Sequence, residues 1–218
     1  ILVIESKEAI ETPKRYRNQF GQLLENTPFC ERDIVTPKHN TQLTTEQVDV
    51  MVKLSNGLQK YTYLHHPFDV VGWDGYYYPY AFNISNFMPI TGKIHQPPPV
   101  HQTFQSKNFV ICSFVPRLFD YHPNSIPAPY AHSNIDSDEI IYYVDGDFMS
   151  RKGVKKESMT YHPMGLPHGP QPGKTEESLG AKETNEYAVM IDTFKKLNIT
   201  KSAMEVSNEE YPFSWIEK

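Results

Sequence analysis

Residues 130–170, YAHSNIDSDEIIYYVDGDFMSRKGVKKESMTYHPMGLPHGP, place two histidine-bearing turns on either side of a run of strand-like residues. The first turn carries His132 and Glu139, and an Asp-Gly pair ends the run that follows. The second turn carries His168. Two imidazoles and one carboxylate, delivered from separate strand ends, suit a redox-active divalent metal with open coordination positions. The stretch therefore predicts a metal site.

The spacing of these residues matches the two sequence signatures of the cupin barrel. The first signature, H-x-N-x4-E-x6-G, runs over residues 132–146, with Asn134 where many cupins have a second histidine. The second, P-x-G-x2-H, runs over residues 163–168. Two signatures with the right spacing and separation are a stronger indication than either alone. We therefore predict three metal ligands: His132, Glu139 and His168.

Each ligand has a simpler explanation when it is taken singly. A lone histidine near proline is more often a hydrogen-bonded loop residue than a ligand. Glu139 alone could equally be a solvated carboxylate at a strand start, because Asp136 and Asp138 carry the same charge beside it. The strand register that follows Glu139 favours this residue as the ligand.

The ligand set indicates the kind of metal chemistry. Two imidazoles and a carboxylate leave about three cis positions, the arrangement of non-haem Fe(II) oxygenases, in which substrate oxygen and dioxygen bind together. A cupin isomerase or epimerase commonly uses all four ligand positions, so Asn134 favours the three-ligand iron chemistry. A metal-dependent isomerase and a catalytically silent binding or assembly module stay open as alternatives.

Composition favours an all-β-dominated fold with long loops. The chain has 18 prolines, and aromatic residues make up 13% of it, which argues against a helical bundle. Short alternating runs at residues 139–144, 147–150, 158–162 and 186–193, with a buried strand at 109–115, predict a cupin barrel of the jelly-roll type with a few short helices.

The chain is predicted to have two parts, an N-terminal extension over residues 1–60 and a cupin barrel over residues 61–218. It starts at Ile1 without a methionine, and its first four residues resemble a strand whose predecessor is missing. We therefore expect a fragment or a processed chain. Residues 200–205 predict one or two helical turns, and the tail offers no catalytic candidate.

Two local structures are predicted in the extension. Thr12 as a possible N-cap, followed by Pro13 at the first helical position, predicts a helix. Alternation over residues 48–54 and 58–64, on either side of Asn56-Gly57, predicts a type I′ β-hairpin.

Charge and cysteine usage exclude several classes of partner. The net charge of −5, with acidic and basic residues intermixed, argues against a nucleic-acid or membrane-surface partner, so we expect a small-molecule ligand. No apolar run is long enough to span a membrane. The two cysteines, Cys30 in a polar turn and Cys112 in an apolar strand, do not suggest a disulfide framework. We expect a cytoplasmic protein.

Whole segments of the chain resemble the homogentisate 1,2-dioxygenase family, particularly its bacterial branch. The segments are FDVVGWDGYYYPYAFNISNFMPI (68–90), IHQPPPVHQTF (94–104), PYAHSNIDSDE (129–139) and HPMGLPHGP (162–170). Members of the family have two cupin-like halves, and this chain resembles the C-terminal, iron-binding half. The resemblance implies an absent N-terminal half as a covalent or associated partner, and homo-oligomers, trimers or hexamers.

The resemblance also implies roles for individual residues. The predicted metal ligands would bind Fe(II), His95 would be the acid/base histidine, and His162 a second pocket histidine. Spacing alone does not distinguish His95 from His101. Tyr130 would hold the substrate carboxylate together with Arg151, which replaces the lysine of the family.

Phe148 stands where another tyrosine is common in the family. Loss of that phenolic donor weakens the recognition of one particular carboxylate position. The resemblance implies an extradiol-type dioxygenase that uses O2 to open homogentisate to 4-maleylacetoacetate in tyrosine and phenylalanine catabolism. A related dioxygenase for a hydroquinone or gentisate-like acid stays open as an alternative.

Overall fold

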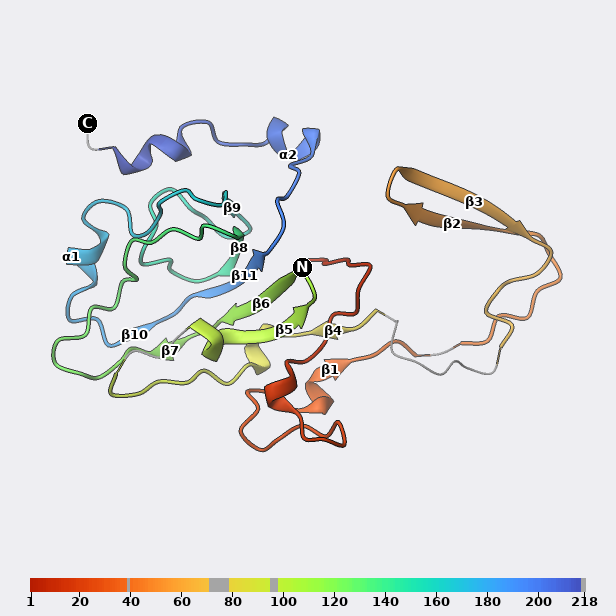
Figure 1. Cartoon of the computed structure of the whole chain (residues 1–218), viewed down its shortest axis with the longest axis horizontal. Helices are drawn as coiled ribbons and strands as arrows, with labels where there is room; N and C mark the ends of the chain where they lie inside the picture. Colours follow the sequence, from red (N-terminus) through yellow and green to blue (C-terminus); the bar gives the residue numbers. More distant parts are fainter. Residues whose placement is uncertain (39, 71–78, 95–97, 217–218) are drawn as a thin grey trace. The chain divides into compact units, whose positions relative to one another are not determined.

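A computed structural model of the chain describes residues 1–38, 40–70, 79–94 and 98–216. Strands dominate these residues, and the helices are short (Figure 1). The strands are β1 (Ile34–Val35), β2 (Val48–Leu54), β3 (Gly57–Tyr63), β4 (Ala81–Phe82), β5 (Gln102–Ser106), β6 (Phe109–Phe114), β7 (Arg117–Leu118), β8 (Asp138–Asp145), β9 (Met159–His162), β10 (Glu183–Thr184) and β11 (Tyr187–Thr193). The helices are α1 (Lys174–Ser178) and α2 (Lys201–Glu205), with 3₁₀ turns η1 (Lys14–Tyr16), η2 (Glu31–Asp33), η3 (Ile84–Asn86), η4 (Pro98–His101) and η5 (Tyr211–Trp215). Among the described residues, no helix has the length and apolar character needed to cross a bilayer.

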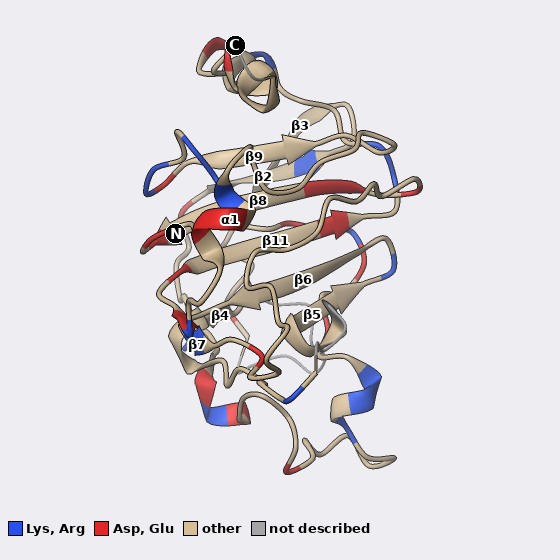
Figure 2. Ribbon diagram, turned by 90° about the vertical axis from the view of Figure 1, so that its left-hand side faces the viewer, with Lys and Arg blue, Asp and Glu red and all other residues tan. Residues whose placement is uncertain are grey.

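One antiparallel sheet of five strands, in the order β5-β6-β11-β8-β9, carries most of the long-range pairing. Figure 2 shows these strands one below another, with acidic and basic residues interspersed. The predicted β-dominated, cupin-type fold is confirmed, and β6, β8, β9 and β11 match the predicted strands. In the described part of the chain, the paired strands form this open sheet and several two-stranded sheets rather than a closed ring.

The core of the sheet lies where β8 and β11 pair. Tyr143 and Ala188 face each other across the two strands and are buried together with Phe148. Gly146, directly after β8, has a φ of +97°, and a side chain there would collide with the backbone carbonyl of Asn185. Glycine at this position therefore lets β8 turn away while the neighbouring chain stays in contact.

The chain divides into two compact units. One comprises residues 1–33 and 82–218 and contains the five-stranded sheet; the other comprises residues 34–81 and contains the β2–β3 hairpin. The predicted boundary at residue 60 lies inside β3, and the predicted division into extension and barrel stays a prediction.

The predicted hairpin is confirmed, but its predicted turn type is wrong. Leu54 pairs with Gly57, so Ser55 and Asn56 form the two-residue loop. A type I′ turn needs a positive φ at both loop residues, and neither has one. Glycine instead occupies the first position of β3, with a φ of +151°.

The predicted helix after Thr12 is also wrong. Only η1 forms, with Pro13 as its N-cap. The Asn18 side chain accepts hydrogen bonds from the backbone N–H of Phe20 (2.9 Å) and Gln22 (3.1 Å), which stabilises a turn. The local side-chain bonds therefore prevail over the helical pattern.

Two predicted strands are absent from the structure. Residues 1–4 form no strand. Residues 147–150 form a turn instead, in which the N–H of Arg151 donates to the carbonyl of Phe148 (3.1 Å). The predicted helical turn near residue 200 is confirmed as α2, where the Thr200 hydroxyl caps the N–H of Ala203 (3.2 Å).

Candidate metal centre

A backbone bridge joins the two histidine turns. The N–H of His132 donates to the carbonyl of His168, and the N–H of His168 donates to the carbonyl of His132, both at 2.8 Å. The two ring centroids lie 4.4 Å apart. A Cβ on Gly169 would lie 2.6 Å from Cα of Ala131, so glycine permits this close approach of the turns. Residues 36 positions apart in the sequence therefore present their imidazoles together.

Each of these imidazoles is held by a backbone carbonyl two residues earlier. Nδ1 of His132 lies 3.2 Å from the carbonyl oxygen of Tyr130, and Nδ1 of His168 lies 2.9 Å from that of Leu166. Because a carbonyl only accepts, Nδ1 carries the proton in both rings. The lone pair on each Nε2 is then available to a metal, and the hydrogen bond fixes the ring orientation.

The carboxylate of the site comes from the sheet. Glu139 is the second residue of β8 and pairs in register with His162 of β9. Nδ1 of His162 lies 2.7 Å from Oε1 of Glu139, and Nε2 of His168 lies 3.5 Å from the same oxygen. His132, Glu139 and His168 each offer one ligand atom, and these atoms lie within 4.8 Å of one another.

Burial and hydrogen bonding set the charges in the site. Burial raises the pKa of Glu139, but the contacts with His162 and His168 outweigh it and lower the pKa to about 2. For His162, burial outweighs the hydrogen bond to Glu139 and lowers the pKa. For His168, burial is outweighed by the contact with Glu139, which raises the pKa. Glu139 is therefore an anion at neutral pH.

The donor set fits a divalent metal. Nε2 of His162 and Nε2 of His168 are buried and have no hydrogen-bond partner among the described residues. Buried polar atoms are normally paired, so an unpaired Nε2 beside a carboxylate is suited to bind a ligand. Two imidazole nitrogens and one carboxylate suit a transition metal better than magnesium or calcium, which prefer oxygen ligands. His132, Glu139 and His168 could therefore hold such a metal.

Asp138 and Asp136, the acidic neighbours of Glu139, have other surroundings. Asp138 is fully buried, and its carboxylate accepts hydrogen bonds from the backbone N–H of Met164 (2.8 Å) and Leu197 (2.6 Å). Burial raises the pKa of Asp138, but these bonds outweigh it and lower the pKa. Asp136 is exposed. Asp138 therefore supports the second histidine turn rather than offering itself as a ligand.

The residues predicted to contact substrate have different environments. Tyr130 is exposed, and its ring lies 5.7 Å from that of His132. Nη1 of Arg151 donates to the carbonyl of Gly169 (2.5 Å), beside His168. Phe148 is buried against Tyr143, with ring centroids 4.6 Å apart. Their roles toward substrate stay predictions.

Of the two loop histidines, His95 lies outside the described residues. His101 is the last residue of η4, and its ring lies 4.6 Å from that of Phe114. His162, the second predicted pocket histidine, lies in the site itself, with its ring stacked on that of His168 at a centroid distance of 4.3 Å.

Two residues near the site were not among the predicted site residues. Asp192 of β11 pairs in register with Glu139, and its buried Oδ1 has no hydrogen-bond partner among the described residues. Burial and the charge of Glu139 raise the pKa of Asp192 to about 6. The alternation of β11 could have placed it on the same face as the ligand. Tyr211 lies in the tail, where no local pattern marks it.

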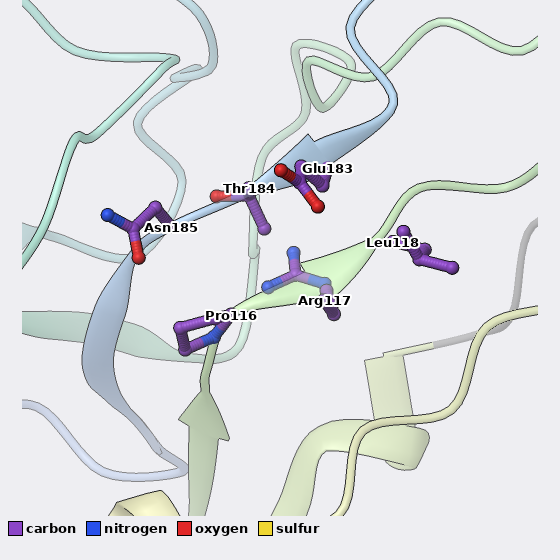
Figure 3. A pocket seen from close by; sticks show the side chains of 6 residues that line it. All are labelled: Pro116, Arg117, Leu118, Glu183, Thr184 and Asn185. Atoms are coloured by element: carbon purple, nitrogen blue, oxygen red, sulfur yellow. The ribbon is translucent and has the colours of Figure 1, made fainter.

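A separate pocket of about 440 Å³ lies between β7 and β10 (Figure 3). Arg117, which lines it, forms an ion pair with Glu186 at 3.1 Å. No predicted site residue lines this pocket. Its lining consists of Pro116, Arg117, Leu118, Glu183, Thr184 and Asn185.

Comparison with known proteins identifies relatives along nearly the whole chain. A protein of Saccharolobus solfataricus with the name "Putative dioxygenase" is 46% identical over 217 residues, which cover 99% of this chain and 56% of that protein. Homogentisate 1,2-dioxygenase of Bradyrhizobium diazoefficiens is 28% identical over 84% of this chain and 44% of its own length. The enzyme of that name from Rhodopseudomonas palustris is 26% identical over 89% of this chain and 47% of its own length.

The family model of the homogentisate 1,2-dioxygenase N-terminal region matches residues 18–84, on both sides of the predicted boundary at residue 60. The chain spans about half the length of the curated relatives that it matches. By this match and these relatives, the chain belongs to the homogentisate 1,2-dioxygenase family.

Proposed function

We propose that the chain carries the iron site of a dioxygenase that opens the ring of homogentisate to 4-maleylacetoacetate in the cytoplasm. The observation that carries the proposal is the group of His132, Glu139 and His168, whose ligand atoms lie within 4.8 Å of one another. The names of the relatives, one a dioxygenase and others homogentisate 1,2-dioxygenases, support the same reaction class.

The two imidazoles and the carboxylate are suited to Fe(II). Hydrogen bonds from Nδ1 to the carbonyls of Tyr130 and Leu166 orient both rings and leave Nε2 to bind metal. Glu139 supplies one negative charge and keeps its second oxygen for the metal, because Oε1 faces His162. When bound, Fe(II) would supply open positions for substrate and dioxygen and the redox chemistry that links them.

His162 is the proton acceptor that we assign within the described residues. Its Nδ1 faces the carboxylate of Glu139, so this nitrogen carries the proton and donates it in a hydrogen bond. Burial lowers the pKa of His162, so the ring is neutral and Nε2 is free to accept a proton from a ring hydroxyl of the substrate. His95 would share this role, by the family resemblance alone.

Arg151 supplies positive charge for the carboxylate of the aromatic acid. Its Nη1 is held by the carbonyl of Gly169 (2.5 Å), directly after His168, so the guanidinium has a fixed place beside the metal ligands. Its buried Nε has no hydrogen-bond partner among the described residues. A planar guanidinium with a spare donor suits a carboxylate.

Both atoms of dioxygen enter the ring-opened product, so the reaction needs no external reductant.

Oxygen consumption by the protein in its natural state tests the proposal. The chain, with any polypeptide that co-purifies, is loaded with Fe(II) without air and then given oxygen and homogentisate. We expect iron-dependent uptake of about one O2 per substrate molecule, as ring opening by a dioxygenase requires. Uptake with gentisate alone would favour the related hydroquinone dioxygenase. Absence of uptake with either acid would contradict the proposal, and turnover with zinc or manganese without oxygen would favour an isomerase.

A further inference from the structure

The C-terminal turn η5 is attached to the chain that follows the ligand His168. Nε1 of Trp215 donates to the carbonyl oxygen of Gly169 at 3.2 Å, and Nε2 of Gln171 donates to Oγ of Ser214 at 2.5 Å. Gln171 is almost completely buried, and its bond to Ser214 is partly shielded from water. The tail is therefore part of the surroundings of the metal site.

Arg151 connects η5 to the predicted substrate carboxylate position. Its Nη1 donates to the same Gly169 carbonyl that Trp215 uses, and its guanidinium carbon lies 5.8 Å from the centre of the Trp215 ring. Stacking on an aromatic face holds a guanidinium in one orientation. Trp215 therefore fixes the cation that we assign to the substrate carboxylate.

Tyr211 brings a second unpaired polar group to this place. Its hydroxyl is buried and, among the described residues, has no hydrogen-bond partner, as is true of Nε of Arg151. Its ring packs edge-on against Trp215 at a centroid distance of 5.3 Å. A buried hydroxyl without a partner destabilises the fold, so its burial here calls for an external partner.

The hydroxyl of Tyr211 lies within electrostatic reach of Arg151, Tyr143 and Glu139. Burial and the nearby Tyr143 raise its pKa above the usual range, and Arg151 only partly opposes this. The phenol therefore stays protonated and can donate a hydrogen bond. The Tyr143 hydroxyl, by contrast, already lies 3.2 Å from that of Thr160.

We propose that Tyr211 positions the substrate by donating a hydrogen bond to the carboxylate of the aromatic acid beside Arg151. It would replace the phenolic donor that the family commonly has at the position of Phe148, which here is buried in the core against Tyr143. Tyr211 lies 63 residues after Phe148 in the sequence. This inference rests on the proposed function, because it assumes an aromatic acid as the substrate.

Replacement of the hydroxyl alone tests the role of Tyr211. Tyr211→Phe keeps the ring that packs against Trp215, and Tyr121→Phe makes the same change on an exposed loop residue and serves as the control. Homogentisate binding is measured without oxygen on the iron-loaded protein, and turnover is measured with oxygen. Tyr211→Phe should weaken substrate binding about tenfold, the loss expected for one hydrogen bond to a charged group.

A substrate analogue identifies the group that Tyr211 contacts. The methyl ester of homogentisate lacks the carboxylate charge, so it should bind wild type more weakly than the acid, and Tyr211→Phe should reduce this preference. The variant should also melt at the same temperature as wild type or higher, because it no longer buries an unpaired hydroxyl. A purely structural role would instead lower the melting temperature and leave the preference for the acid unchanged.

The outcomes separate this inference from the proposed function. Wild type that consumes oxygen, together with a Tyr211→Phe variant that binds the acid as tightly and keeps the full preference over the ester, would overturn the role of Tyr211 alone. Wild type that binds no hydroquinone acid would overturn the proposed function and this inference with it.

Discussion

The five-stranded sheet and the β2–β3 hairpin are both built from strands with alternating sequences, yet they use their apolar side chains differently. In β8, Tyr143 is 4% exposed and packs in the core. In β3, Leu58 is 67% exposed, and no residue of β2 or β3 is buried. Alternation therefore predicts that a strand forms, whereas its partners decide whether a face becomes core.

The largest expected difference between the two regions is in stability. Ile111 of β6 is 6% exposed, so Ile111→Ala should lower the free energy of unfolding by about 3 kcal/mol. Leu58→Ala, in the hairpin, should change it by less than about 0.5 kcal/mol because Leu58 is already in contact with water. Urea unfolding monitored by tryptophan fluorescence measures both. Equal losses would mean that the hairpin residue is buried in solution.

A smaller effect is expected at the buried carboxylate beside the site. Asp138→Asn keeps the size of the side chain but replaces a charged acceptor of the Met164 and Leu197 N–H groups, and should cost about 2 kcal/mol. The matched change Asp136→Asn affects an exposed residue and should cost almost nothing. The same unfolding experiment compares them. Indistinguishable curves would show that Asp138 does not hold the second histidine turn.

The two cysteines give the most local test of burial in the sheet. Both are free, Cys30 is exposed, and Cys112 of β6 is buried. Burial raises the pKa of the Cys112 thiol to about 12, so it has almost no thiolate at neutral pH. A thiol reagent should label one cysteine per native chain and both after denaturation, which mass spectrometry of the peptides can check. Rapid labelling of Cys112 in the native protein would indicate an open sheet.

Sequence analysis succeeded where the information is local. The His132 turn precedes β8 and the His168 turn follows β9, and these two strands pair with each other. The spacing in the sequence therefore predicts that both histidines lie close to Glu139. The hairpin can be predicted because its two alternating runs are adjacent in the sequence. The hydrogen bonds that turn the imidazoles, by contrast, depend on backbone carbonyls whose direction no spacing rule gives.

The failures come from competing contacts and long sequence separation. The pattern after Thr12 is helical, but Asn18 binds nearby backbone N–H groups, and Tyr16 donates to the carbonyl of Gln102 (2.8 Å) on a distant strand. The Asp-Gly pair predicts a turn after β8, but the sequence does not show that residues 147–150 also turn instead of starting a new strand. The sequence does not predict the position of Tyr211, because the tail is attached near the site by a bond from Nε1 of Trp215 to the carbonyl of Gly169, 46 residues apart in the sequence.

His132, Glu139 and His168 are proposed to hold a metal ion together. The iron content of protein loaded with Fe(II) without air, measured for wild type and for His168→Ala, tests this proposal. His122→Ala, which removes an exposed histidine, is the control. We expect about one iron per chain in wild type and in the control and almost none in His168→Ala, because the variant loses one of three ligands. Full iron content in a folded His168→Ala protein would show that these residues do not form the metal site.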